Sequence, residues 1–327
     1  MNVFVFSSRN FEIPVLEQAN KGKHHLTFFS ARLSQETCAL AKGADAVVVF
    51  SNDDVGASTI AELVKYGVKM VAYRAAGYNT IDLDAAKRAG LKVARVPAYS
   101  PFAIAEHTVA LMLALNRKLI KAHRRVQDLN FSLDGLVGFD MHGKTVGVIG
   151  VGKIGEKLVH ILNGFGCKVL AYDVEENALL KDQVEYTSMT KLLNSSDIIS
   201  LHVPLSAETK YMIDKDQIQQ MKRGVMLINT SRGGLIHTKA VIDALKTGQI
   251  GYLGIDVYEE EAGLFFKEHE EDMIADDVIA RLMTFKNVLI TGHQAFLTQT
   301  ALENIAATTV KNLDDFAEGK SSENFLL

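Results

Sequence analysis

The chain has 327 residues, of which 48% are hydrophobic and 23% charged, and its formal net charge is −4 at pH 7. This length predicts about two globular domains of roughly 100–200 residues each. The small negative charge gives no overall attraction to nucleic acid or to an anionic membrane, so neither partner is expected. The sequence has no signal-like start, and Cys38 and Cys167 form no CxxC pair. Both observations predict a cytoplasmic protein with free thiols.

The first hundred residues alternate between short strand-like runs and amphipathic helical runs. Strands are predicted at 2–6, 45–50, 69–74 and 92–96. A helix is predicted between the last two of them, with Thr80 as its N-cap and Gly90 as its stop. Such alternation predicts a parallel sheet, so the chain to about residue 99 is expected to form one doubly wound unit.

A stiff crossing and a long helix follow this unit. Two of the chain's four prolines lie in VPAYSP, residues 96–101. Ser100 can cap a helix that has Pro101 in its first turn. We therefore predict a domain boundary at this crossing and one helix over roughly residues 101–128.

A second series of strands is predicted after that helix. Continuous runs of valine, isoleucine and leucine indicate strands that are buried on both faces. The predicted strands are 145–150, 168–173, 197–204, 224–232, 252–258 and 287–293. The last predicted helix, 298–319, could pack on either domain, and a return to the first would make the second domain an insertion.

The stretch VGVIGVGKIG, residues 146–155, contains the spacing Gly150-x-Gly152-x-x-Gly155 between a strand and a helix. In a dinucleotide-binding turn these glycines allow the tight turn, the approach of pyrophosphate and close helix packing. Asp173 ends the next strand, at the spacing where a carboxylate holds the adenosine ribose. The alternative is a glycine-rich turn with an unrelated acid. Because Asp173 repels a 2′-phosphate and no arginine follows closely, NAD is predicted rather than NADP.

Polar residues also end the other strands of the second series. Open parallel sheets bind ligands in the crevice at the carboxyl ends of their strands, so these residues predict a site. They are His202 and Pro204, then Thr230, Ser231 and Arg232, then Asp256, and finally His293.

Three of the polar residues near these strand ends suit acid–base chemistry on a carbonyl group. His293, in TGHQ, is of the type that exchanges a proton near neutral pH. A carboxylate such as Glu261 would favour its protonated form, and Arg232 is a planar cation suited to a carboxylate or carbonyl oxygen. The alternatives are a strand-end histidine, a solvated acidic loop and a structural arginine. No HExxH or paired histidine spacing occurs, so no metal site is expected.

The segments NTSRGGLI, GIDVYEEEAGLFF and TGHQAFLT, together with VGVIGVGKIG, resemble the D-isomer-specific 2-hydroxyacid dehydrogenases. The resemblance runs from about residue 74 to about residue 300. It is strongest to the bacterial fermentative D-lactate dehydrogenase branch, on VPAYSPFAIAEHT, GLFF and GHQAF. Ala262 stands where many relatives carry proline after the catalytic glutamate, which also fits that branch.

The resemblance implies a role for each site residue. His293 would protonate the carbonyl oxygen of pyruvate as hydride arrives from NADH, Glu261 would hold His293 protonated, and Arg232 would polarise the carbonyl and bind the carboxylate. Backbone amides near Ala76 and Gly77 would also bind the carboxylate, and Tyr99 and Phe296 would enclose the methyl group. The implied NAD contacts are Gly150, Gly152, Lys153, Ile154, Gly155, Asp173, Val203, Pro204, Thr209, Thr230, Ser231 and Asp256.

The resemblance further implies an α/β fold with two Rossmann-like domains. The NAD-binding domain, 100–298, would be inserted into a substrate domain made of 1–99 and 299–327. A homodimer is implied, with a homotetramer as the alternative. Two other functions stay open: a D-2-hydroxyisocaproate-type dehydrogenase with a larger side-chain pocket, and an NAD-sensing corepressor-like binding protein.

Overall fold

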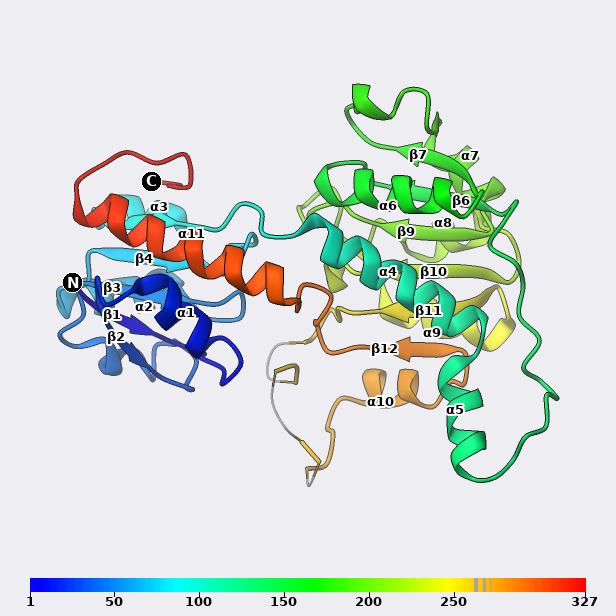
Figure 1. Ribbon diagram of the computed structural model, residues 1–327, viewed down its shortest axis with the longest axis horizontal. Helices are drawn as coiled ribbons and strands as arrows, with labels where there is room; N and C mark the ends of the chain where they lie inside the picture. Colours follow the sequence, from blue (N-terminus) through cyan, green and yellow to red (C-terminus); the bar gives the residue numbers. More distant parts are fainter. Residues whose placement is uncertain (262–263, 267–268, 271) are drawn as a thin grey trace. The chain divides into compact units, whose positions relative to one another are not determined.

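The computed structural model describes residues 1–261, 264–266, 269–270 and 272–327. The chain divides into two compact units (Figure 1). The first contains Met1–Ser100 and Leu297–Leu327, and the second contains Pro101–Phe296. Within the described residues, no helix is both long and apolar enough to cross a membrane.

The first unit is built on a five-stranded parallel sheet with the order β2-β1-β3-β4-β5. All residues of the two strands β3 and β4 are buried, as expected for a parallel sheet covered on both faces. Its strands are β1 (Asn2–Val5), β2 (His25–Phe28), β3 (Ala46–Val49), β4 (Met70–Tyr73) and β5 (Lys92–Ala94).

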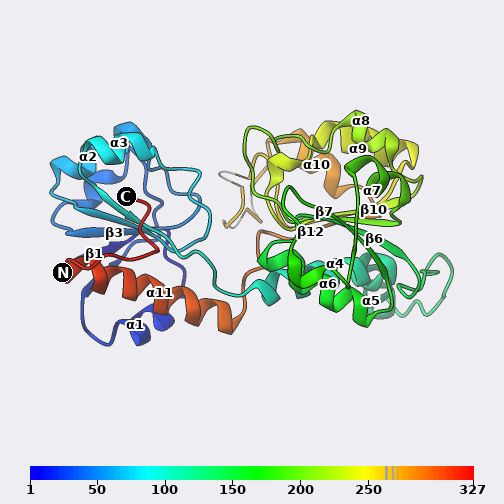
Figure 2. The same cartoon turned by 90° about the horizontal axis from the view of Figure 1, so that it is seen from above.

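Helices cover both faces of this sheet (Figure 2). One face packs against α1 (Ile13–Asn20) and α11 (Gln299–Ala317), and the other packs against α2 (Ala57–Lys65) and α3 (Leu83–Arg88). A 3₁₀ helix, η1 (Cys38–Ala41), lies before β3. The predicted Thr80 cap is wrong, because the Asp82 carboxylate caps α3 by accepting from the Ala85 amide at 2.8 Å.

The second unit contains a seven-stranded parallel sheet with the order β12-β11-β10-β9-β6-β7-β8 over its described residues. The chain runs outward from β6 to β8 and then returns to β9 beside β6. This change of direction creates a crevice at the carboxyl ends of β6 and β9. The strands are β6 (Thr145–Ile149), β7 (Lys168–Tyr172), β8 (Glu185–Tyr186), β9 (Ile198–Leu201), β10 (Val225–Asn229), β11 (Ile250–Ile255) and β12 (Val288–Ile290).

Two groups of helices cover this second sheet (Figure 2). One face packs against α4 (Pro101–Asn116) and α6 (Lys153–Gly164), with α5 (Leu119–Gln127) on the same side. The opposite side carries α7 (Met189–Ser195), α8 (Lys215–Gln220), α9 (Thr238–Thr247) and α10 (Asp277–Met283). The short 3₁₀ helices are η2 (Ala178–Leu180) and η3 (Gly233–Leu235).

The predicted single helix over 101–128 is wrong, because two helices occupy this stretch. Lys118 lies between α4 and α5 with a φ of 53°, a left-handed conformation that interrupts a right-handed helix. The two helices also differ in burial. Most of α4 is buried against the sheet, whereas α5 has no buried residue.

Candidate active site

The glycine loop between β6 and α6 has the geometry of a phosphate-binding turn. Gly150 has a φ of 94°, and a β-carbon there would lie 2.7 Å from the backbone of His202. A β-carbon on Gly155 would lie 2.0 Å from the Gly150 carbonyl oxygen, so strand and helix pack too closely for a side chain. Gly152, the N-cap of α6, faces open space. That space lies in front of helix amides that can bind phosphate, so these residues fit a dinucleotide.

Asp173 follows β7 and closes the opposite side of this loop. Its carboxylate accepts hydrogen bonds from the Val151 amide and from the Val174 amide, both at 2.7 Å. The Asn177 side chain donates to the Val151 carbonyl at 3.2 Å and supports the same turn. The carboxylate is therefore held beside the glycine loop, where the adenosine ribose of a dinucleotide would lie. Lys153 and Ile154, the first residues of α6, continue the loop.

The end of β9 lies against the end of β6. The His202 amide donates to the Ile149 carbonyl at 2.7 Å, and the His202 ring contacts the Ser200 hydroxyl at 2.8 Å. Desolvation lowers the pKa of His202 to about 4, so its ring is neutral at pH 7. Further along, the Thr209 hydroxyl donates to the Pro204 carbonyl at 2.7 Å, which closes a local turn.

The end of β10 carries three of the predicted residues in one turn. The Ser231 hydroxyl donates to the Val203 carbonyl at 2.6 Å, which joins this turn to the loop after β9. Asn229, which the sequence analysis does not single out, braces the turn because its side chain accepts from Ser231 and donates to the Arg232 carbonyl at 2.8 Å. The Thr230 hydroxyl lies 2.8 Å from that of Thr108 on α4.

Glu261 and His293 meet, although they come from different loops. Their Oε1 and Nδ1 atoms are 3.0 Å apart, and both side chains are about four-fifths buried, with 20% and 18% exposure. The second Glu261 oxygen accepts from the Tyr258 amide at 3.2 Å, which fixes the carboxylate. The His293 ring therefore has Nδ1 turned to an acid and Nε2 available for a substrate. Ala262 lies outside the described residues.

The loop that carries His293 is anchored by Asp256, which is fully buried after β11. The His293 amide donates to the Asp256 carbonyl at 2.7 Å. The Asp256 carboxylate accepts from the amides of Gln294 and Ala295 at 2.9 and 2.8 Å. Burial alone would raise the pKa of this carboxyl, but hydrogen bonds from His107, Thr291 and these amides outweigh it, and the pKa lies below its ordinary value.

These contacts join the strand ends of the second unit into one region. The loop after β10 also lies against the loop after β11, since a β-carbon on Gly233 would lie 2.0 Å from the Tyr258 carbonyl carbon. Phe296 is buried at the end of this unit. Two residues of the network, His107 and Thr291, are not singled out by the sequence analysis; a polar Glu-His-Thr triplet inside the apolar helix α4 is the available signal.

Three predicted substrate contacts belong to the first unit. The Ala76 carbonyl accepts from the Arg95 guanidinium at 3.2 Å, and Gly77 follows it, half-buried. Nearby, buried Arg74 pairs with Glu12. The Tyr99 carbonyl accepts from the Asn304 side chain at 2.6 Å, which ties it to α11. In the part of the chain that the structure describes, no group of three or more metal-binding side chains comes together.

Comparisons with known proteins identify the second unit. Residues 109–295 match the D-isomer specific 2-hydroxyacid dehydrogenase, NAD binding domain. D-lactate dehydrogenase of Escherichia coli (strain K12) is 48% identical over 100% of both chains. The pyruvate reductase structure of Chlamydomonas reinhardtii has a TM-score of 0.94 and 44% identity, covering 99% of this chain and 98% of that one.

A third match carries bound ligands. The D-lactate dehydrogenase of Aquifex aeolicus, solved with NAD and lactic acid, has a TM-score of 0.89 and 36% identity over 99% of each chain. The predicted fold class, two parallel-sheet α/β domains, is confirmed by these structures and by the two sheets. With the glycine loop, Asp173 and the Glu261–His293 pair in one unit, the chain belongs to the D-isomer specific 2-hydroxyacid dehydrogenase family, and its cofactor is NAD.

Proposed function

We propose that this chain is an NAD-dependent D-lactate dehydrogenase that reduces pyruvate to D-lactate. The observation that carries the proposal is the Glu261–His293 pair in the unit that contains the NAD-binding loop. The similarity of the whole chain to D-lactate dehydrogenases supports pyruvate as the keto acid. The first unit, which holds Ala76, Gly77 and Tyr99, is the proposed substrate domain.

His293 is the proposed general acid. Bound NADH supplies the hydride, and the developing alkoxide then needs a proton, which His293 Nε2 can donate. Glu261 accepts the Nδ1 hydrogen, so the ring is held in one orientation with Nε2 directed away from the carboxylate. In lactate oxidation the neutral ring takes the hydroxyl proton back. Proton and hydride together account for both hydrogens added to the carbonyl.

Arg232 is the proposed electrophile. Its guanidinium carries a permanent planar charge that matches a carboxylate and a carbonyl oxygen. The turn that bears it is braced on one side by Asn229 and on the other by Ser231, so the side chain starts from a fixed backbone. Backbone amides near Ala76 and Gly77 are proposed to bind the substrate carboxylate, and Tyr99 and Phe296 to contact its methyl group.

The NAD contacts are proposed from the same strand ends. Amides of the glycine loop would bind the pyrophosphate, and Asp173 would bind the adenosine ribose. The proposed contacts are Gly150, Gly152, Lys153, Ile154, Gly155, Asp173, Val203, Pro204, Thr209, Thr230, Ser231 and Asp256.

The test is NADH oxidation with pyruvate, followed by chiral analysis of the product. Turnover that yields D-lactate supports the proposal. Turnover that is faster with a branched keto acid, compared as kcat/KM, moves the substrate to the larger hydroxy acids; a tenfold preference needs only about 1.4 kcal/mol. NADH binding without turnover of any keto acid would overturn the catalytic proposal in favour of a binding protein.

A homodimer is the proposed assembly, and its proposed interface is the surface of α5 and the segment after it. Several large apolar side chains are exposed there, which is unusual for a free surface. They are Leu119, Ile120, Val126, Leu129, Phe131, Leu133 and Val137, with exposures from 47% to 83%. Arg125 and Lys121 hold the segment to α5 by donating to the Asp134 and Gly135 carbonyls at 2.7 and 3.3 Å.

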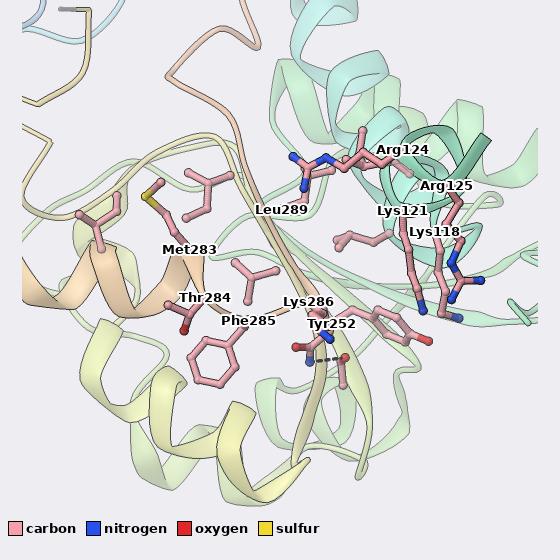
Figure 3. A pocket seen from close by; sticks show the side chains of 18 of the residues that line it. Lys118, Lys121, Arg124, Arg125, Tyr252, Met283, Thr284, Phe285, Lys286 and Leu289 are labelled. Carbon is pink, nitrogen blue, oxygen red and sulfur yellow. Dashed lines mark hydrogen bonds between the residues drawn. The ribbon is translucent and has the colours of Figure 1, made fainter. Parts of the chain in front are cut away.

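A cavity of about 1060 Å³ adjoins this surface (Figure 3). Lys121, Arg124 and Arg125 of α5 line it, together with Lys118, which precedes α5, and with Tyr252 and Lys286. The predicted catalytic residues are not among its described lining residues. We assign the cavity to the proposed interface, because a second copy would cover both it and the exposed apolar side chains.

Light scattering after size-exclusion chromatography tests the assembly. Leu129→Asp with Phe131→Asp is expected to give a monomer, whereas Leu179→Asp, at a 72% exposed site on η2, should leave the mass unchanged. A monomeric parent would overturn the proposal, and a fourfold mass would replace the dimer by a homotetramer.

A cytoplasmic location is also proposed. Cys38 and Cys167 are free and buried, as expected in a reducing compartment. Burial raises the pKa of both thiols, so they are protonated and unreactive at neutral pH.

A further inference from the structure

His107 on α4 contacts the residues that hold the loop of His293. Its Nε2 atom lies 3.1 Å from the Thr291 hydroxyl and 3.5 Å from Asp256 Oδ1. The side chain is 18% exposed, so it is largely enclosed by the second unit. His107 therefore contacts both the Thr291 hydroxyl and the carboxylate that anchors the loop of the proposed acid.

The hydrogen bonds have one consistent direction. The Thr291 hydroxyl donates its only hydrogen to the Asp256 carboxylate, 2.5 Å away. Its oxygen must then accept, so His107 Nε2 must carry a hydrogen and donate it. The lowered pKa of Asp256 agrees with a carboxylate that only accepts. The shorter hydrogen bonds therefore run from His107 to Thr291 and from Thr291 to Asp256, and His107 Nε2 also faces the same carboxylate at 3.5 Å.

Asp256 in turn holds the backbone of the His293 loop. Its carboxylate binds the two amides that follow His293, and its carbonyl binds the His293 amide itself. His293 has a φ of 55°, a conformation that a residue with a β-carbon adopts only where its surroundings impose it. The loop needs these contacts because its left-handed backbone is not intrinsically stable.

The neighbouring residue on α4 makes a matching contact. The Thr108 hydroxyl donates to the Ile104 carbonyl at 2.8 Å, so it accepts from the Thr230 hydroxyl at the end of β10. Two consecutive side chains of one buried helix thus bind the ends of β10, β11 and β12. A helix gives these groups a more rigid base than a loop would.

We propose that His107 is a positioning residue for the proposed acid His293, acting as a hydrogen-bond donor through Thr291 and Asp256. The inference rests on the proposed function, because it gives His107 a place in the same reaction. It requires a hydrogen-bond donor at the place of Nε2. A glutamine, whose amide nitrogen reaches the place of Nε2, should therefore replace His107, whereas leucine should not.

The experiment compares His107→Leu and His107→Gln with the parent enzyme. His107→Leu is expected to lower kcat for pyruvate about tenfold or more, with the KM for pyruvate and the Kd for NADH within about twofold of the parent. His107→Gln should restore most of kcat. The control is His160→Leu, at a 43% exposed side chain on α6, which should change none of these values.

Hydrogen exchange supplies a readout that needs no turnover. In His107→Leu the Gln294 and Ala295 amides should exchange about tenfold faster than in the parent, while β6 amides keep their protection. If the parent turns over no keto acid, the proposed function fails, and these amides still test the positioning role.

Two results would overturn the inference. One is a His107→Leu variant whose kcat and amide exchange both equal those of the parent. The other is an equal loss of kcat in His107→Leu and His107→Gln. If His107→Leu does not fold, Thr291→Val and Thr291→Ser replace it as the test. Valine removes the hydroxyl that links His107 to Asp256 and should lower kcat, whereas serine keeps the hydroxyl and should not; equal behaviour of the two would overturn the inference.

Discussion

Glu261 and His293 belong to loops after two adjacent strands, β11 and β12, and their Oε1 and Nδ1 atoms lie 3.0 Å apart. The contact directs the ring so that Nε2 is the atom left to exchange a proton. Asp256 holds the backbone of the His293 loop. The backbone of this loop and the Glu261–His293 side-chain contact are therefore fixed by different hydrogen bonds. Loss of His293, loss of Glu261 and loss of the contacts that hold the His293 loop should therefore have different kinetic signatures.

Replacement of His293 by alanine should lower kcat for pyruvate reduction by about 10²- to 10⁴-fold, the usual contribution of a positioned acid. The Kd for NADH should stay within about twofold, because the proposed role concerns the carbonyl oxygen. Stopped-flow absorbance and NADH fluorescence titration measure the two quantities. Retained turnover at neutral pH would remove His293 from its proposed role.

Replacement of Glu261 by glutamine should have a smaller effect than loss of His293, about tenfold to a hundredfold in kcat. The glutamine carbonyl still accepts from Nδ1 and orients the ring, but the hydrogen bond loses its charged acceptor and is weaker. In the double variant Glu261→Gln, His293→Ala the loss should equal that of His293→Ala alone, since the glutamate acts through the histidine. Additive losses would show that Glu261 acts on the substrate by another route.

Most strands of both sheets were predictable because apolar runs bounded by turns mark buried parallel strands. The missed strand β2 has the sequence HLTF and lies at an edge, where none of its residues is buried. The other missed strand, β8, contains only Glu185 and Tyr186. Neither has the apolar run on which the prediction depends. The break at Lys118 was hidden because lysine favours helices and the left-handed conformation is not visible in its residue type.

The residue types of the candidate site could be predicted at strand ends, but their contacts could not. Glu261 meets His293 only because β11 and β12 are neighbours in the sheet, and the order of strands is a long-range property. The contact of His107 with Thr291 could not be predicted for the same reason. His107 lies far from Thr291 in sequence, and a histidine on an apolar helix is ordinarily a core residue.

The glycines of the NAD loop give a matched set of substitutions. Gly152→Ala should fold normally, because its β-carbon meets open space, but it should weaken NADH binding about tenfold or more by occupying the approach of the pyrophosphate. Gly155→Ala should lower the free energy of unfolding by several kcal/mol, since its β-carbon would lie 2.0 Å from the Gly150 oxygen. Gly164→Ala, with open space and no proposed ligand contact, is the control for both.

Calorimetric titration with NADH and urea unfolding separate these effects. Unchanged NADH affinity in Gly152→Ala would contradict the proposed position of the pyrophosphate. A Gly155→Ala protein as stable as the parent would contradict the close packing of α6 on the loop.

Asp173 is expected to select NAD over NADP by charge. In Asp173→Ser the ratio of kcat/KM for NADH to that for NADPH should fall at least about tenfold, equivalent to about 1.4 kcal/mol, because the 2′-phosphate no longer meets a carboxylate. Activity with NADH should also fall, since Val151 loses its acceptor. The control is Glu175→Gln, an exposed acid two residues on, which should leave the ratio unchanged. An unaltered ratio in Asp173→Ser would remove this residue from the ribose site.

The lowered pKa of His202 leads us to expect a fall in the free energy of unfolding in mild acid. Its pKa in the folded chain is about 4, against an ordinary value of 6.5, so the unfolded chain binds the proton more tightly between these pH values. Stability is therefore complete above pH 6.5 and declines as the pH falls toward 4. At pH 4.5 the loss due to this one group should be as much as about 2–3 kcal/mol. His202→Gln, which keeps a donor toward Ser200, should remove that part of the pH dependence.

Urea unfolding of parent and variant at pH 7 and pH 4.5 measures the difference directly, because the other titrating groups are common to both proteins. The expected result is a larger fall in the free energy of unfolding for the parent. His160→Gln, a substitution at a 43% exposed histidine on α6, should follow the parent at both pH values. Equal falls in the parent and in His202→Gln would mean that the ring is protonated in the folded chain at pH 4.5, and that its surroundings stabilise the charge instead of excluding it.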